Sequence, residues 1–274
     1  MANQNMFEAM TVKELNIYYL LDTSSSMAGA AIAALNDAMR ATIKELKKID
    51  AGSNEAVIRI GALQFNSRAE WVTVNEEKEA VVLYAEDFPD WRDLSAEGFT
   101  ALGAALTELN KNLSRNHLQK AETGNWAPVV IIMSDGYPND SWNPALAKLQ
   151  KNTWYQQAIK IAFALGENAD VEVLSQVVGT SEAVIQTNDL EAFKKAIQIV
   201  SVTSSLAGST STTTGIRKEG KDIVKEVGGK YAGNGEKGET VLPAGIAVDD
   251  HMDDVYVMNG AAKDIDFGNQ SKFN

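Results

Sequence analysis

Hydroxyl and carboxylate side chains gather where two long apolar runs of the sequence end. The run at residues 15–22 leads into DTSSSM, the run at 127–135 ends in MSD, and a third segment, TALGAAL, opens on a threonine. Such oxygens are hard ligands, and a set of them without imidazole or thiolate selects Mg²⁺, Mn²⁺ or Ca²⁺. The candidate metal ligands are Asp22, Ser24, Ser26, Thr100 and Asp135.

Composition excludes several other kinds of site and partner. The chain has no cysteine and only two histidines, which excludes disulfides, thiolate zinc sites and a histidine-rich metal centre within one chain. The absence of cysteine is consistent with a reducing, cytoplasmic setting. The net charge of −12 repels phosphate backbones, so we expect no nucleic-acid partner. The first residues show no signal peptide, and no apolar stretch reaches membrane-spanning length, so we expect no membrane partner.

The hydrophobic pattern alternates between short apolar runs and amphipathic stretches. The predicted strands are 15–22, 56–65, 69–74, 127–135, 158–166 and 183–188, and the predicted helices are 31–49, 100–113, 143–151, 170–179 and 189–202. This alternation predicts an α/β fold with a doubly wound, mostly parallel sheet. Only three residues separate 56–65 from 69–74, which suits a hairpin and makes 69–74 an antiparallel edge strand.

The predicted fold brings the candidate ligands to one place. In open α/β sheets, ligands bind outside the carboxyl ends of the strands, where the strand order switches. If their strands are neighbours, Asp22 and Asp135 face one crevice there, and Thr100 can lean into it from the start of its helix. The irregular stretch 75–99 is long enough to be a functional loop or a lid.

These motifs resemble a known family. DTSSS, the threonine of GFTALG, and SDG, in this order and on these elements, resemble the von Willebrand factor A (VWA) fold with its metal-ion-dependent adhesion site. The resemblance covers residues 12–205, and the motifs look most like the cytoplasmic bacterial (TerY-like) branch associated with tellurium resistance and stress operons.

The resemblance implies roles for the individual ligands. The positions of Ser24, Ser26 and often Thr100 touch the metal directly in the family, while those of Asp22 and Asp135 act directly or through water. An acidic side chain of a protein partner commonly completes the shell. The family usually has glycine between the two serines, where this chain has Ser25; glycine adopts a positive φ at little cost and serine does not.

Three functions follow as hypotheses. The first is a protein-binding module that uses Mg²⁺, with Mn²⁺ or Ca²⁺ as alternatives, as a scaffold or regulator in a stress-response or defence system. Its partner would supply an Asp or Glu, with an operon-encoded kinase or phosphatase as a candidate, and Tyr137 and Trp142 would rim the site. The second is a metal-dependent phosphoryl-transfer or hydrolytic enzyme, which needs a base or basic clamp that the site segments lack. The third is a purely structural cation site.

The chain divides into a VWA domain, residues 1–205, and a remainder, 206–274. The remainder begins with a Ser/Thr-rich linker, in which Thr213 suits phosphorylation, and continues as an acidic tail that we expect to be flexible. The segment DDHMDD (249–254) is interpreted as a solvated acidic patch, with a second possibility that it acts as an internal ligand of the metal. Asp140 is interpreted as a turn or helix-cap residue rather than a ligand.

Overall fold

A computed structural model describes residues 13–52, 56–121, 124–135, 137–166, 169–189 and 218–230, together with 191, 193–197, 200, 201 and 204. Its strands are β1 (Lys13–Asp22), β2 (Ala56–Phe65), β3 (Ala69–Trp71), β4 (Leu83–Tyr84), β5 (Val129–Ser134), β6 (Ile159–Leu165) and β7 (Val184–Thr187). Its α-helices are α1 (Ala30–Gly52), α2 (Leu102–Asn112), α3 (Trp142–Leu149), α4 (Thr153–Gln157), α5 (Val171–Val178) and α7 (Gly220–Lys230), and its 3₁₀ turns are η1 (Ser25–Met27) and η2 (Ser181–Ala183). Residues 193–197 are also helical.

The strands form one sheet in the order β3-β2-β1-β5-β6-β7. The pairs from β2 through β1, β5 and β6 to β7 are parallel, and β3 runs antiparallel on β2. This confirms the predicted fold class. The stretch 75–99 is less irregular than expected, because it contains β4, which also pairs antiparallel with β2. The expected strand 69–74 is shorter in the structure and ends at Trp71.

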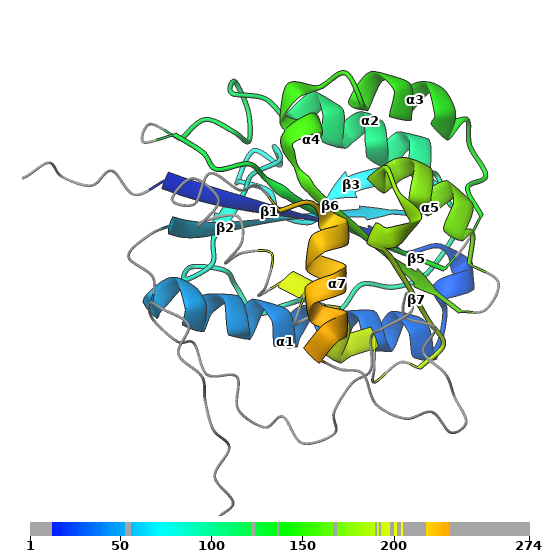
Figure 1. Ribbon diagram of the computed structural model, residues 1–274. Helices are drawn as coiled ribbons and strands as arrows, with labels where there is room; N and C mark the ends of the chain where they lie inside the picture. Colours follow the sequence, from blue (N-terminus) through cyan, green and yellow to red (C-terminus); the bar gives the residue numbers. More distant parts are fainter. Residues whose placement is uncertain are drawn as a thin grey trace, which may run out of the picture.

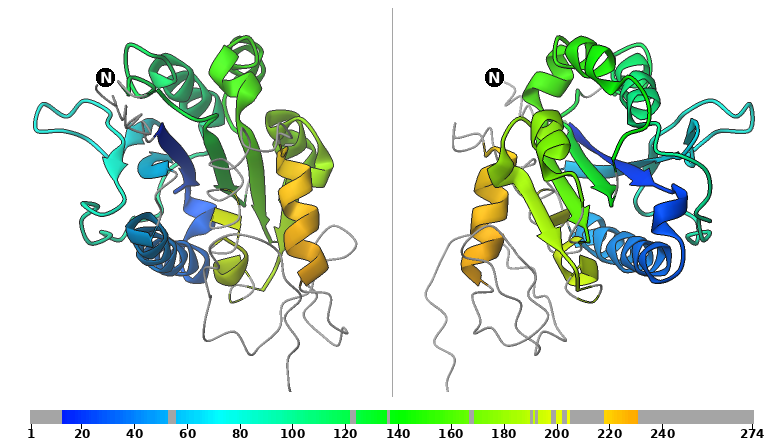
Figure 2. Two further views of the ribbon diagram at one scale, coloured as in Figure 1. Left: turned by 60° about the vertical axis from the view of Figure 1, so that its left-hand side comes forward. Right: turned by 90° about the vertical axis from the view of Figure 1, so that its right-hand side faces the viewer.

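Helices cover both faces of the sheet (Figure 1). One face packs side chains of α1, α7 and residues 193–197 against Leu15, Ile17 and Tyr19 of β1. The other face packs α2, α3 and α5 against Tyr18 and Leu20, the alternate residues of the same strand. In both views of Figure 2, α1 lies on one side of the sheet and α2 and α3 lie on the other. The strands β1 and β5 are therefore buried on both faces, which explains their continuous apolar sequence.

The strand order reverses between β1 and β5. The chain moves from β1 to β2 in one direction, and β5 is then added on the other side of β1. The register pairs Leu21 with Met133, so Asp22 and Ser134 follow next to each other at the carboxyl end of the sheet. This is the switch point at which open α/β sheets bind ligands.

Two helices were not expected from the sequence. The short α4 begins after Asn152, whose side chain accepts hydrogen bonds from the backbone N–H groups of Trp154 and Tyr155. The helix α7 lies within the segment that was expected to be a flexible tail, and that expectation is wrong for residues 218–230, because Ile223 and Val224 are fully buried in the core. The linker 206–217, with Thr213, and the acidic segment 249–254 lie outside the described residues. The boundary at residue 205 stays a prediction.

Gly220 allows α7 to sit directly on the sheet. A Cβ atom built on this residue would overlap the backbone carbonyl of Lys160 in β6. Only glycine therefore permits this closeness between the start of the helix and the strand.

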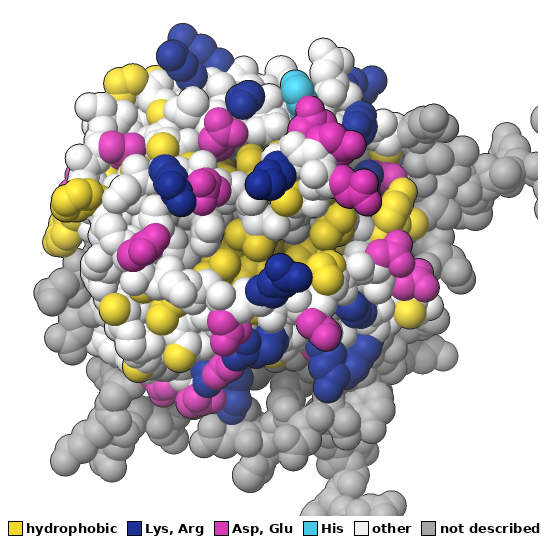
Figure 3. Space-filling view, turned by 180° about the vertical axis from the view of Figure 1, so that it is seen from behind, with side chains coloured by type: hydrophobic (Ala, Val, Ile, Leu, Met, Phe, Trp, Pro, Cys, Tyr) yellow, Lys and Arg dark blue, Asp and Glu magenta, His cyan; other side chains and the backbone are white. Residues whose placement is uncertain are grey.

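Both signs of charge are mixed on the described surface. Figure 3 shows acidic and basic side chains side by side around an exposed hydrophobic area, so the net charge of −12 does not make this face uniformly negative. Within the described residues, no helix combines the length and the apolar character needed to cross a bilayer.

Candidate metal centre

Asp22 forms the floor of the candidate site. Its side chain is fully buried at the end of β1, and both carboxylate oxygens accept hydrogen bonds. The backbone N–H of Ser24 donates to Oδ1 at 2.8 Å, and the hydroxyl of Ser134 donates to Oδ2 at 2.6 Å. The carboxylate is thus held from the loop after β1 and from the end of β5, which fixes its orientation at the carboxyl end of the sheet.

A series of oxygens leads from this floor to the surface. The hydroxyls of Ser24 and Ser26 lie 3.0 Å apart, and Ser26 donates to Oδ1 of Asp135 at 2.9 Å. Ser24 is buried and Ser26 is exposed, so the series opens to solvent at one end. Neighbouring ligands in an octahedron around Mg²⁺ lie about 2.9 Å apart, since each metal–oxygen bond is about 2.05 Å long. The two separations fit adjacent positions of one coordination shell.

Thr100 takes no part in the hydrogen bonds of this series. Its backbone N–H donates to Oδ1 of Asn139 at 2.9 Å, and the backbone N–H of Asn139 donates to the Thr100 carbonyl at 2.9 Å. Its side chain is almost completely buried, and its hydroxyl makes no hydrogen bond with another described residue. The structure therefore links Asp22, Ser24, Ser26 and Asp135 directly through hydrogen bonds, whereas Thr100 makes no hydrogen bond to any of them.

The end of the 75–99 stretch braces the serine loop. The backbone N–H of Ser25 donates to the Gly98 carbonyl at 3.1 Å, and the N–H of Glu97 donates to the Thr23 carbonyl at 2.8 Å. Gly98 has a φ of +75°, which favours glycine, and a Cβ there would overlap the hydroxyl of Ser67. Earlier in the stretch, the side-chain amide of Asn36 on α1 donates to the Leu94 carbonyl and accepts a hydrogen bond from the Leu94 N–H. The stretch is thus a fixed support of the site in this structure.

No positive side chain offsets the two site carboxylates within the described residues. Burial raises the pKa of Asp22 from its ordinary 3.8 to about 6, although hydrogen bonds from Ser134 and Ser24 oppose the shift. Burial also raises the pKa of Asp135, against the hydrogen bond from Ser26. No lysine, arginine or histidine contributes to either shift. The charge of the buried carboxylate is left uncompensated, and a cation is the natural species to balance it.

The donor set relies on hydroxyls as much as on carboxylates. The described residues contain no group of three or more His, Cys, Asp or Glu side chains placed to hold a metal. The oxygen set here suits Mg²⁺ or Mn²⁺ and does not suit a soft metal that needs thiolate or imidazole ligands.

Ser25 does not strain the loop. Among the described residues, the one non-glycine residue with a positive φ is Lys78, so Ser25 adopts an ordinary backbone conformation within η1. The substitution of serine for the family's usual glycine therefore has no backbone cost at this position.

Asp140 acts as a helix cap. Its two carboxylate oxygens accept hydrogen bonds from the backbone N–H groups of Gly103 and Ala104 at 2.9 and 3.0 Å, at the start of α2. The cap comes from a different segment of the chain, and it ties α2 to the loop that follows β5. It agrees with the interpretation of Asp140 as a capping residue.

The aromatic residues near the site differ in exposure. Tyr137 is 61% exposed, whereas Trp142 is partly buried against the core under α2. Phe99 was not predicted as a site residue and is 71% exposed, directly before Thr100. Phe99 could have been predicted as a site residue from the sequence, because it directly precedes the candidate ligand Thr100.

Two other supporting residues were missed by sequence reasoning. Ser134 holds Asp22, and Asn139 holds Thr100. Ser134 is a polar residue at the end of an otherwise apolar strand, which is a usable signal. The role of Asn139 depends on a contact across 39 residues of sequence and had no local signal.

Solved structures with the same fold come from several kinds of protein. The chain superposes on a von Willebrand factor type A protein from Catenulispora acidiphila with a TM-score of 0.51 at 16% identity, over 70% of this chain and 43% of that one. It also superposes on a structure of proximal thread matrix protein 1 of the mussel byssus, in which the metal-ion-dependent adhesion site (MIDAS) motif of that protein is occupied by zinc. The TM-score is 0.50 at 20% identity, over 69% of this chain and 48% of that one. The pilus adhesin SpaC of Lactobacillus rhamnosus GG gives a TM-score of 0.53 at 12% identity, over 70% of this chain and 30% of that one.

These likenesses concern the fold, and the chain spans less than half of the length of each of these three structures. Curated protein sequences contain no match to it. The profile of the von Willebrand factor type A domain, however, matches residues 16–200, which include all five candidate ligands. The parallel sheet, the switch point between β1 and β5 and this match together show that the chain belongs to the von Willebrand factor type A domain family.

Proposed function

We propose that the chain is a metal-dependent protein-binding module of the adhesion-site type. Mg²⁺ is the proposed ion, with Mn²⁺ or Ca²⁺ as alternatives. The observation that carries the proposal is the series of oxygens from Ser24 through Ser26 to Asp135, whose separations of 3.0 and 2.9 Å suit one coordination shell. The proposed ligands are Asp22, Ser24, Ser26, Thr100 and Asp135. When bound, the ion supplies a positive charge that can accept a carboxylate of a partner.

The surroundings of the site suit a protein partner. Phe99 and Tyr137 are the two most exposed large hydrophobic residues among the described residues. Phe99 directly precedes Thr100 in the sequence, and Tyr137 follows Asp135 by two residues. Aromatic side chains are enriched at protein interfaces, because they bury a large area at low entropic cost. A partner with an Asp or Glu between apolar side chains would contact the ion and both rings. Trp142, being partly buried, is assigned a supporting place at this rim.

The proposed setting is a bacterial stress-response or defence system in the cytoplasm. It rests on the likeness of DTSSSM, TALGAAL and SDGYPND to the tellurium-resistance branch of the family. An operon-encoded kinase or phosphatase is the proposed class of partner, and the module would act as a scaffold or regulator for it.

The enzymatic alternative is less well supported. Phosphoryl transfer or hydrolysis needs a base or a basic clamp at the metal. Within the described residues, neither Asp22 nor Asp135 has a lysine, arginine or histidine near enough to shift its pKa. The surroundings of the carboxylates therefore favour binding over catalysis.

Calorimetric titration with Mg²⁺ and Mn²⁺ tests the metal site. Asp22→Ala and Ser24→Ala should each abolish binding while circular dichroism shows that the fold survives. Ser25→Ala is the matched control, since this exposed serine lies between the two ligands and its side chain makes no hydrogen bond with a described residue. Unchanged binding in both ligand variants would place the metal elsewhere.

Capture of partners from a lysate, with and without EDTA, tests the binding role. Metal-dependent capture by the wild type and its loss in Asp22→Ala are the expected results. Thr100→Ala should weaken partner binding more than metal binding, because in the family this hydroxyl joins the shell mainly in the ligand-bound form. An equal loss of both affinities would contradict that role for Thr100.

A further inference from the structure

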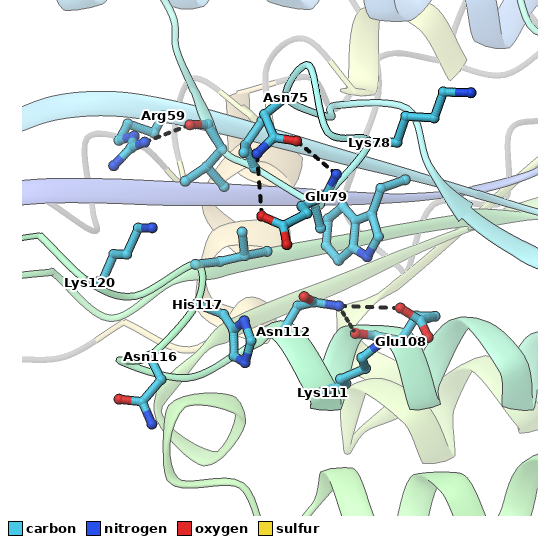
Figure 4. Close-up of a pocket in the computed structure, with 15 residues that line it drawn as sticks. Arg59, Asn75, Lys78, Glu79, Glu108, Lys111, Asn112, Asn116, His117 and Lys120 are labelled. Carbon is cyan, nitrogen blue, oxygen red and sulfur yellow. Dashed lines mark hydrogen bonds and ion pairs between the residues drawn. The ribbon is translucent and has the colours of Figure 1, made fainter.

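A pocket opens toward the amino ends of the strands, away from the candidate metal centre. It has a volume of about 590 Å³ and lies between the hairpin after β3 and the C-terminal part of α2 with its following loop (Figure 4). Arg59 lines it and precedes Phe65, the end of β2, by six residues, or about 20 Å along the strand. We name this site the amino-edge pocket; it shares no lining residue with the metal centre.

Basic side chains outnumber acidic ones around the amino-edge pocket, although the whole chain carries a net charge of −12. The basic lining residues are Arg59, Lys78, Lys111 and Lys120, and the acidic ones are Glu79 and Glu108. His117 lines it as well. The local excess of positive charge on an acidic protein points to an anionic ligand.

Some of these cations are already paired, and others are free to meet a ligand. Arg59 pairs with Glu14 at 2.6 Å, and Lys111 approaches Glu108 at 3.6 Å. The side chains of Lys120 and His117 make no ion pair or hydrogen bond with another described residue. Figure 4 shows Lys120 extending toward the middle of the pocket, while Lys78 extends outward at its rim.

The rest of the wall adds an apolar floor. Val82 and Leu118 are buried and contribute apolar surface. Cationic side chains together with apolar surface suit a ligand that carries acceptor oxygens at one end and an organic group at the other.

We propose that the amino-edge pocket binds a small phosphate ester. Its phosphate would lie against Lys111, His117 and Lys120, and its organic part would pack on Trp71 and Leu118. A phosphate suits this arrangement better than a planar carboxylate, because its oxygens point in several directions and the three donors are spread over the end of α2 and the loop after it. The volume lies within the range of about 300–1,000 Å³ that small-molecule sites occupy.

Titration followed by NMR of the full chain in EDTA tests the proposal, since removal of divalent ions prevents binding of phosphate through a metal. The probes are glycerol 3-phosphate, adenosine 5′-monophosphate and inorganic phosphate, with glycerol as the uncharged comparison. At least one ester should bind at millimolar concentration or below and shift the signals of the Trp71 indole and His117. Lys120→Glu should weaken that binding by about tenfold or more.

Lys44→Glu is the matched control. It reverses the same charge as Lys120→Glu, but Lys44 is exposed on α1, on the opposite face of the sheet. It should leave the affinity within about twofold, as for a screened surface charge. Failure of both esters to bind the folded wild type would overturn the proposal. Equal weakening by the two lysine variants, or binding of glycerol as tight as that of its phosphate, would overturn it too. The outcome is independent of the metal centre, because every arm is metal-free.

Discussion

Replacing Asp22 by asparagine is expected to stabilise the metal-free domain at neutral pH. The native carboxyl binds its proton more tightly than the unfolded one, since burial raises its pKa from 3.8 to about 6. The free energy of unfolding therefore falls as the pH rises between these values and stays lower above them. A shift of this size corresponds to about 3 kcal/mol. Asparagine keeps the shape of the side chain and removes the charge.

Urea unfolding in EDTA, followed by circular dichroism, measures the effect. At pH 7.5 the variant should be more stable than the wild type by about 1–3 kcal/mol, and near pH 3.5 the difference should vanish. Asp90→Asn makes the same chemical change at an exposed position and should alter stability by less than about 0.5 kcal/mol. A variant less stable than the wild type at pH 7.5 would refute the reasoning, because it would show that the hydrogen bonds to Asp22 outweigh the cost of its burial.

The same substitution should reverse its effect when Mg²⁺ is added. A ligand that binds only the folded state stabilises it by about 2.7 kcal/mol at a concentration of one hundred times its Kd. The wild type should gain this stability and Asp22→Asn should not. Stabilisation of both proteins by the ion to the same extent would separate Asp22 from the metal.

Three further predictions concern the site and the fold. Mg²⁺ affinity should fall by about tenfold per pH unit below pH 6, as protons compete for Asp22, and calorimetric titration from pH 5 to 8 checks this. Gly98→Ala should weaken metal binding without removing a ligand, because the positive φ and the overlap with Ser67 force the brace of the serine loop to move; calorimetry against wild type measures it. Gly220→Val should separate α7 from the sheet and lower the free energy of unfolding by about 2–4 kcal/mol in urea titrations, and unchanged stability would contradict the close packing.

The parts of the site that follow from the sequence are those that end a strong local pattern. Asp22 and Asp135 follow long apolar runs, so both had to lie at the carboxyl end of a buried strand. The contact of Ser134 with Asp22 depends on the register that pairs Leu21 with Met133, and no single segment encodes it. A contact between a candidate ligand and the residue that supports it can be predicted only once the pairing of the strands is known.

The helix α7 escaped sequence reasoning for a different physical reason. Glycines lie at its first residue and near its end, which lowers its intrinsic helix propensity. Its apolar residues, Ile223, Val224 and Val227, follow a helical spacing over little more than one turn, which is too short a pattern to predict a helix. Packing on the sheet, rather than the local pattern, therefore decides that this segment is a helix.

The docking of α7 also determines where the chain can be shortened. A cut at residue 205, close to the end of the family match at residue 200, would remove the helix that lies over β6 and β7. The apolar side chains beneath Ile223 and Val224 would then face water, and two such fragments could cover them by associating. A fragment that extends through residue 230 keeps α7, which covers these apolar side chains. Studies of the domain in isolation should therefore use that longer fragment, so that self-association is not mistaken for binding of a partner.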